Sequence, residues 1–168
     1  MNITYHILKF LARTSSRGFH KNVRFSDLSH YIPDLLEQTD RVKYLTLFLR
    51  EPRAVVVLTP RLYDIGKRLT LVLMATARKY TLLKKIQTEL ERSGTSSTIR
   101  MNALESSKRL YLRVDSELNE ARIQKVLSAV ILDTYQLDEN IILDVEVATS
   151  EMMVLKEVAS DPVFTLDK

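Results

Sequence analysis

Apolar residues follow two patterns in the middle of the chain, short continuous runs and regular alternation. Residues 54–58 read AVVVL and residues 69–75 read LTLVLMA. Each run is the right length for a strand that is buried on both faces. Residues 110–114 and 141–147 instead alternate apolar with polar side chains, which is typical of a strand with one wet face. The sequence therefore predicts a strand in each of these four ranges.

Two further stretches have helical spacing. The range 79–92 has an apolar stripe, and Gly94 is placed to end that helix. Its stripe consists of Leu82, Leu83, Ile86 and Leu90. Ser116 can cap a second helix that runs to about Tyr135. The residues of that helix expected to face the core are Ile123, Val126, Leu127, Val130 and Ile131.

The order strand, strand, helix, strand, helix, strand predicts the fold class. It favours α/β, with α+β as the alternative, in a single-domain sandwich of a mixed sheet with helices on one or both faces. If the strands at 110–114 and 141–147 pair, Asp144 and Glu146 would lie beside Arg109 and Arg113.

The connecting segments are less regular. Ser26 can cap a short helix, and Pro33 can sit near the start of another. Residues 42–50 fit a strand and a helix equally well. We expect a turn or short helix at 60–66 and a flexible link at 93–97, with a short helix and a frayed tail at the C-terminal end.

These elements and the composition divide the chain into four parts. They are a mitochondrial targeting peptide at 1–25, an N-terminal helical segment at 26–53, an α/β domain at 54–150 and a C-terminal tail at 151–168.

The targeting assignment rests on the first 25 residues, which contain five Lys or Arg residues and no Asp or Glu. On a helix, Ile3, Ile7, Phe10 and Leu11 share one face. Basic, acid-free and amphipathic is typical of a presequence, and it predicts the mitochondrial matrix as the destination. Arg17 to Phe19 resembles a presequence cleavage site, so cleavage is expected after Phe19. The alternatives are a helix packed on the domain and a surface anchor.

Charge is distributed unevenly along the chain. The formal net charge of the whole chain is +4. Residues 1–25 contribute +5, so the remaining residues together carry −1. Residues 41–125 hold 18 bases and eight acids, whereas residues 133–168 hold two bases and nine acids. The basic middle can bind RNA or an acidic partner, or it can pair with the acidic tail within the fold.

The side chains needed for catalysis are scarce. The chain has no Cys, three His and three Gly, which excludes disulfides, cysteine ligands and a glycine-rich phosphate loop. Asp64 and Asp115 follow predicted strands, where a turn and a helix start explain them. We therefore expect a protein that is not an enzyme and has no metal or cofactor.

Basic residues near the start of the 79–92 helix are the main candidate site. They are Arg78, Lys79, Lys84 and Lys85. A helix N-terminus with nearby cations suits phosphate, including an RNA backbone, and Tyr80 adds a stacking surface. The alternative is a solvated helix face. Lys108, Arg109 and Arg113 extend this set if the fold brings them together.

One stretch resembles a known family. Residues 54–58, Asp64-Ile65, the run LTLVLMATAR at 69–78 and the basic helix that ends at Gly94 are similar to the core of the ribosome silencing factor (iojap) family. The resemblance is closer to its divergent fungal mitochondrial branch, in which an apolar strand runs into Thr-Ala-Arg, here Thr76 to Arg78. It implies an α/β domain that binds the large ribosomal subunit near a ribosomal protein and hinders subunit joining. Fungal mitochondrial relatives serve biogenesis of the ATP synthase membrane ring.

Two functions remain open at this point. The first is a non-enzymatic mitochondrial matrix factor that binds the mitochondrial ribosome or its RNA and supports translation or assembly. The second is a protein-binding assembly factor, or a structural subunit, of a respiratory or ATP synthase complex. In the second case the acidic tail and the 141–147 strand would form the contact. Neither function requires a transmembrane segment, and none is expected.

Overall fold

A computed structural model describes residues 3–15, 18–37, 41–63, 66–74, 78–102, 110–115, 118–151, 154–155 and 157–158. The strands are β1 (Phe19–Arg24), β2 (Arg41–Leu49), β3 (Ala54–Tyr63), β4 (Gly66–Met74), β5 (Ser96–Asn102), β6 (Leu110–Asp115), β7 (Ile142–Glu151), β8 (Val154–Leu155) and β9 (Glu157–Val158). The α-helices are α1 (Ile3–Ser15), α2 (Ile32–Leu36), α3 (Lys79–Arg92) and α4 (Glu120–Leu127). A 3-10 helix η1 (Phe25–Tyr31) precedes α2, and a π-helix η2 (Ser128–Asp133) continues α4.

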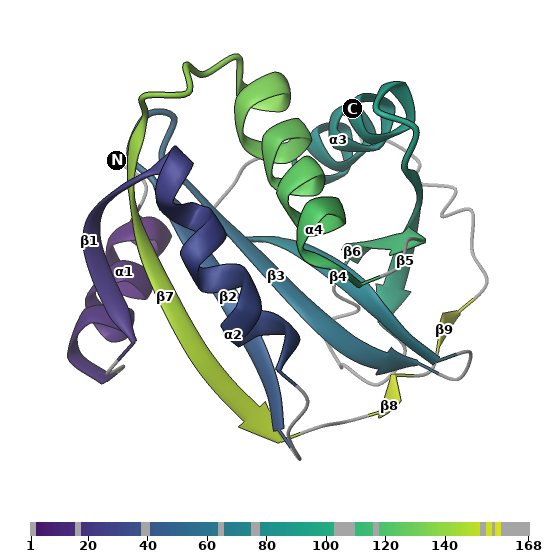
Figure 1. Cartoon of the computed structure of the whole chain (residues 1–168), viewed down its shortest axis with the longest axis horizontal. Helices are drawn as coiled ribbons and strands as arrows, with labels where there is room; N and C mark the ends of the chain where they lie inside the picture. Colours follow the sequence, from purple (N-terminus) through teal and green to yellow (C-terminus); the bar gives the residue numbers. More distant parts are fainter. Residues whose placement is uncertain are drawn as a thin grey trace.

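The strands form one sheet in the order β1-β7-β2-β3-β4-β6-β5-β9. These neighbours pair antiparallel, and the short β8 pairs with β3 in parallel. The sheet is therefore mixed, with helices on both faces (Figure 1). This confirms the predicted single-domain α/β fold.

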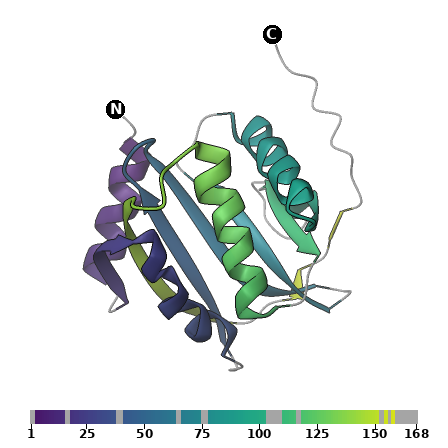
Figure 2. The ribbon, with the colours of Figure 1, turned by 45° about the horizontal axis from the view of Figure 1, so that its top comes forward.

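The main core lies between the sheet and a layer formed by α2, α4 and α3. These helices lie side by side across one face of the sheet (Figure 2). The strands bury alternate residues beneath them because side chains alternate between faces with a period of two. The buried strand residues of this face include Leu45, Leu47, Leu49, Val56, Leu58, Leu69, Leu71, Leu73, Leu112, Val114, Leu143 and Val145.

Local sequence fixes the ends of the two longer helices in this layer. Gly94 adopts φ +76° and follows α3, in the left-handed region that glycine enters at little cost. The side chain of Asn119 caps α4 by accepting a hydrogen bond of 3.0 Å from the Arg122 amide. The π-helix that follows α4 holds Thr134 inside the core, where its hydroxyl donates to the Ala129 carbonyl at 2.8 Å.

Helix α1 packs on the other face of the sheet. Tyr5 and Ala12 are buried against Phe48 and Val55, which project from β2 and β3. The Tyr5 and Phe48 rings meet edge to face, with centroids 6.2 Å apart. Residues 3–15 thus form the amphipathic helix that the sequence predicts. In this structure they pack on the domain, which is one of the alternatives to a presequence.

Strand β1 joins this helix to the edge of the sheet. The Gly18 carbonyl accepts a hydrogen bond of 2.9 Å from the Val147 amide. A Cβ atom added at Gly18 would overlap the main-chain carbonyl of Val147. Glycine at this position is therefore explained by the close approach of two backbones.

Several predicted connections are wrong in detail. Of residues 42–50, which fit a strand and a helix equally well, 42–49 lie in β2 and Arg50 begins the turn after it, so the strand alternative holds. The predicted turn or short helix at 60–66 is largely strand, because β3 continues to Tyr63 as one arm of a hairpin with β4. The predicted link at 93–97 already enters β5 at Ser96. In the tail, β8 and β9 form where a short helix was expected.

The predicted domain boundary at residue 54 is absent from the sheet, because β2 lies between β3 and β7. The predicted start of the second helix at Ser116 lies outside the described residues, and α4 begins at Glu120. The proposed proximity of Asp144 and Glu146 to Arg113 is also wrong. Strand β7 pairs with β1 and β2, whereas β6 pairs with β4 and β5.

Candidate functional site

The predicted basic site begins at the N-terminus of α3. Arg78 precedes the helix in a left-handed conformation, with φ 50° and ψ 45°, and its side chain makes no capping hydrogen bond. Its carbonyl accepts from the Leu82 amide at 3.2 Å, which starts the helical ladder. Leu83, Ile86 and Leu90 bury one side of α3. Arg78 is consequently held at an exposed corner while the helix itself is fixed by the core.

Lys84 lies on the outer surface of α3 above an aromatic ring. Its ammonium is 5.9 Å from the centre of the Tyr80 ring, and it donates to the Gln87 side-chain carbonyl at 3.3 Å. Gln87 in turn donates to the Ser97 carbonyl of β5 at 2.7 Å. Tyr80 is packed at the edge of the core, so the cation rests on a rigid support. Arg78, Tyr80 and Lys84 therefore share the first part of α3.

Lys85 points elsewhere. Its ammonium donates to the main-chain carbonyl of Thr134, just beyond η2. Helical geometry places Lys84 and Lys85 about 100° apart around the axis, on opposite flanks of the outer surface. Lys85 thus ties α3 to the neighbouring helix, and Lys79 is half-buried at the first turn.

Arg113 does not join this set. It projects from the sheet face opposite to α3, since its neighbours Leu112 and Val114 are the residues in the α3 core. Arg113 is 8% exposed, and its Nε lies 2.9 Å from Asp115 Oδ1. A guanidinium that is buried and paired in this way is a structural group. Lys108 and Arg109 lie outside the described residues.

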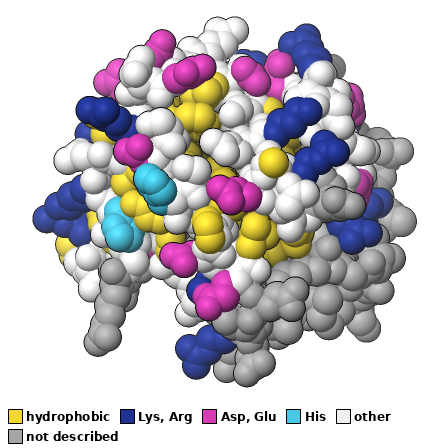
Figure 3. Space-filling view, in the orientation of Figure 1, with side chains coloured by type: hydrophobic (Ala, Val, Ile, Leu, Met, Phe, Trp, Pro, Cys, Tyr) yellow, Lys and Arg dark blue, Asp and Glu magenta, His cyan; other side chains and the backbone are white. Residues whose placement is uncertain are grey.

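Positive charge nevertheless gathers around α3. Figure 3 shows several Lys and Arg side chains over the α3 side of the helical layer, with others at the opposite edge of this face and Asp and Glu side chains between them. The sequence found this region through its charge pattern. It could not show that Lys85 is engaged and Arg113 buried, because both facts depend on tertiary packing.

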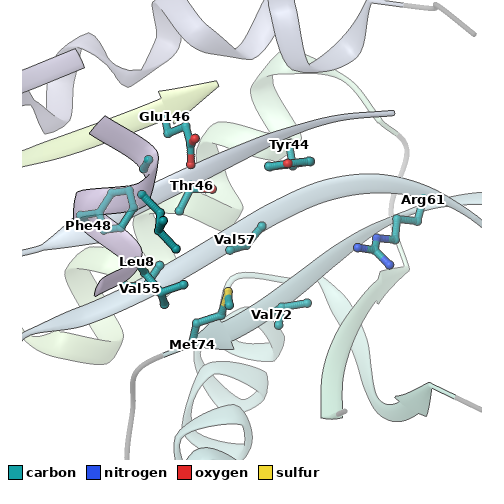
Figure 4. Close-up of a pocket in the computed structure, with 12 residues that line it drawn as sticks. Leu8, Tyr44, Thr46, Phe48, Val55, Val57, Arg61, Val72, Met74 and Glu146 are labelled. Atoms are coloured by element: carbon teal, nitrogen blue, oxygen red, sulfur yellow. The ribbon is translucent and has the colours of Figure 1, made fainter. Parts of the chain in front are cut away.

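A second feature is an apolar groove on the opposite face of the sheet. It has a volume of about 430 Å³ and lies beside α1. Its lining comprises Leu8, Leu11, Ala12, Tyr44, Thr46, Phe48, Val55, Val57, Arg61, Val72, Met74 and Glu146. Figure 4 shows Phe48 and Leu8 at one end of the groove and Arg61 at the other.

The groove exists because β3 and β4 are apolar on both faces. Val57 and Val72 face each other across the two strands, as do Val55 and Met74. The run AVVVL indicated burial on both faces, but α1 covers only part of the second face. The sequence signal for this groove was therefore present. The apolar run was interpreted as a strand buried on both faces, because no sequence pattern predicts how much of the sheet α1 covers.

A charged cluster that the sequence did not predict holds α1 in place. Asp144 is 2% exposed, and its carboxylate meets Lys9 Nζ at 2.5 Å and Arg50 Nη2 at 2.7 Å. The Asn22 amide donates to the same carboxylate at 3.0 Å. Asn22 has φ 55° at an irregularity in the β1–β7 pairing, which aims its amide inward.

Opposing effects set the pKa of Asp144. Burial is the largest single effect and works to raise this pKa. The hydrogen bonds from Lys9, Asn22 and Arg50, with the charge of Lys9, together outweigh it. The pKa of Asp144 therefore lies below its usual range, and the group is a carboxylate at neutral pH.

A polar pocket of about 410 Å³ lies between α1 and the β2–β3 turn. It is lined by Tyr5, His6, Lys9, Arg50, Glu51, Pro52 and Arg53. Arg53 Nη1 lies 3.2 Å from His6 Nε2. Cations thus outnumber the acidic lining residue Glu51, and the pocket suits an anion more than a cation.

Within the described ranges, no group of three or more His, Asp or Glu side chains is arranged to hold a metal ion. No helix in the same ranges has the length and apolar character needed to cross a membrane. Comparisons with protein-family models, curated proteins and solved structures find no match. The resemblance to the ribosome silencing factor family stays a prediction.

Proposed function

We propose that this protein is a non-enzymatic factor of the mitochondrial matrix that binds the mitochondrial ribosome or its RNA and supports translation or assembly. The observation that carries the proposal is the exposed Lys84 above the Tyr80 ring on α3, with the exposed Arg78 at the N-terminus of the same helix. Two cations and an aromatic ring on a rigid helix match the chemistry of an RNA backbone with an unstacked base. The acid-free, basic N-terminal segment supports the proposed mitochondrial location.

The structure sharpens the choice of residues for a test. Lys85 supports the contact between α3 and the end of η2, and Arg113 is buried. Charge reversal at either position would disturb packing as well as binding. The informative variant is therefore the double substitution Arg78→Glu and Lys84→Glu. Arg122→Glu with Lys125→Glu, at two exposed positions of α4, is a matched control with the same change in charge.

The experiment is a sucrose gradient of mitochondrial lysate that contains the tagged protein, with and without RNase. We expect co-migration with a ribosomal subunit, loss of that peak after RNase, and loss in the α3 variant with retention in the α4 control. RNA binding by the purified proteins gives the second readout. Loss of two phosphate contacts lowers the slope of log affinity against log salt by about 2. Ribosome association that is unchanged in the α3 variant would remove this surface from the proposal.

The alternative is a protein-binding assembly factor, or a structural subunit, of a respiratory or ATP synthase complex. The groove beside α1 favours it, because an open apolar surface of this kind is typical of a protein contact. The 141–147 strand is less suited to that contact than expected. It lies between β1 and β2, and Leu143, Asp144 and Val145 are buried. Migration with an inner-membrane complex that is indifferent to RNase would support this alternative.

A further inference from the structure

Helix α1 exposes an apolar stripe to solvent. Ile3, Ile7, Phe10 and Leu11 are each between 50 and 64% exposed. Among the described residues, they are four of the five large apolar side chains that are exposed, and the fifth is Ile142 of β7. Such side chains concentrated on one helix indicate a surface that contacts something else.

The packing of α1 fixes the direction of this stripe. Tyr5 and Ala12, on the opposite side of the helix, are buried against the sheet. Lys9 also holds the helix, through its ion pair with Asp144. The side of α1 that carries these residues is therefore occupied by contacts with the sheet. Ile3, Ile7 and Phe10 are presented outward by a helix that is docked at two points, and Leu11 borders the groove beside it.

Cations line one edge of the stripe. At about 100° per residue, Lys9 and Arg13 lie along the same flank of α1, with the His6 side chain beside them. Arg50 and Arg53 continue this flank in the pocket beside the helix, where Glu51 is the one acidic lining residue. Neither α1 nor β1 contains an Asp or Glu. Asp144, the carboxylate beneath them, is held by Lys9 and Arg50.

We propose that α1 is a membrane-surface anchor that docks on an anionic phospholipid bilayer. In this arrangement the stripe enters the boundary between head groups and acyl chains. The exposed Arg13 meets lipid phosphates, whereas Lys9 and Arg50 stay paired with Asp144. An apolar stripe bordered by cations on a helix parallel to the surface is the geometry of interfacial helices. The inference goes beyond the proposed function and does not rest on it.

Charge complementarity selects this occupant over others. In an antiparallel two-fold contact with a second copy of the chain, the cationic flanks of two α1 helices would come together and repel. In a parallel contact each cationic flank would meet the uncharged flank of the other helix, because α1 contains no Asp or Glu to pair with it. An RNA backbone would satisfy the cations but leave the apolar stripe exposed to water. An anionic bilayer satisfies both parts of the surface.

The test is flotation of the full chain with vesicles of phosphatidylcholine alone and of phosphatidylcholine mixed with phosphatidylglycerol. We expect binding to the mixed vesicles that weakens with salt, because the cations are near the surface. The substitutions Ile7→Ser and Phe10→Ser together should lower binding by about tenfold or more. Ile142→Ser, at an exposed apolar position on β7, is the matched control and should bind as the wild type does.

A second arm isolates charge. Arg13→Glu should lower binding to the mixed vesicles by about tenfold, whereas Lys125→Glu on α4 should leave it unchanged. Circular dichroism melting of each variant checks that the fold is retained, as expected for exposed positions. RNA binding by the Ile7→Ser, Phe10→Ser protein should be normal, which separates this proposal from the α3 surface.

Two results would overturn the anchor. One is equal flotation of the wild-type and the Ile7→Ser, Phe10→Ser proteins, or no flotation of either. The other is a concentration-dependent dimer in analytical ultracentrifugation that the same substitutions abolish, since the stripe would then be a contact between copies.

Discussion

The ammonium of Lys9 and the carboxylate of Asp144, 2.5 Å apart, join the N-terminal helix α1 to strand β7, which comes late in the chain. Arg50 completes the cluster from the turn after β2. A buried carboxylate with two charged partners, from α1 and the β2–β3 turn, and an amide donor from β1 links the placement of α1 to the integrity of the sheet.

Replacing Asp144 by Asn should therefore destabilise the protein and loosen α1. The substitution keeps the shape of the side chain but removes the charge that Lys9 and Arg50 require. We expect a loss of about 1.5–3 kcal/mol in the free energy of unfolding, as for hydrogen bonds to charged groups. Urea unfolding measures this loss, and faster amide exchange in residues 3–15 reports the loosened helix. Asp34→Asn, at an exposed position, is the control and should be close to neutral.

The same cluster predicts a dependence of stability on acid pH. The pKa of Asp144 is lowered in the folded state from an ordinary value of 3.8. Its contribution is therefore fully present above about pH 5 and is lost as pH falls through the folded-state pKa. The free energy of unfolding, measured against pH, should fall below about pH 4, and the Asp144→Asn protein should show a shallower fall. Parallel profiles for the two proteins would contradict this assignment.

Gly18 should not tolerate a side chain. Its Cβ would overlap the Val147 carbonyl, so Gly18→Ala must push β1 away from β7. We expect a loss of about 1–3 kcal/mol, measured by thermal unfolding, with weaker protection of the β1 amides. Lys21→Ala, exposed on the same strand, provides a comparison that should change stability little.

Substitution of Gly94 isolates the cost of a left-handed backbone conformation from that of a steric clash. No atom lies within 4 Å of a Cβ built at this position, while φ is +76°. Gly94→Ala should then cost about 1–2 kcal/mol because of left-handed strain. Gly94→Asn should cost less, since Asn tolerates this conformation. Equal losses for the two variants in chemical denaturation would indicate another cause.

The position of the N-terminus in the mature protein shows whether α1 is removed by cleavage or retained in the fold. Cleavage after Phe19, expected from the sequence, would remove α1 and with it the Lys9 partner of Asp144. Because α1 and β1 are packed into the fold, we expect the helix to be retained. Intact-mass spectrometry of protein isolated from mitochondria measures this directly. A chain beginning at His20 would contradict retention and remove the proposed membrane anchor.

The sequence predicted the fold best where side chains repeat regularly. Residues 79–92 and 110–114 match α3 and β6 closely, because their periodicity comes from one buried face. Strand β5 was missed since Ser96 to Thr98 are polar, and pairing with β6 makes them a strand. Strand β1 was missed because the basic, acid-free segment that contains it was interpreted as a targeting peptide.

The candidate site was only partly predictable. Charge pattern and helix position located Arg78 and Lys84. Burial of Arg113 and the bond from Lys85 to Thr134 depend on residues distant in the sequence, which no local pattern reveals. The Asp144 cluster was hidden for the same reason, since its partners come from α1, β1 and the β2–β3 turn.

The hydrogen bond from Asn22 to Asp144 spans 122 residues, and among the described strands β1 pairs with β7 alone. During synthesis β1 has no pairing partner until β7 has emerged, although α1 can already pack on Phe48 and Val55 of β2 and β3. Under the proposed mitochondrial import, a receptor would encounter the N-terminal segment before β1 is paired. Residues 3–15 and 19–24 form the cover and the edge strand of the folded sheet, so on this proposal a single segment would serve first as a signal and later as structure.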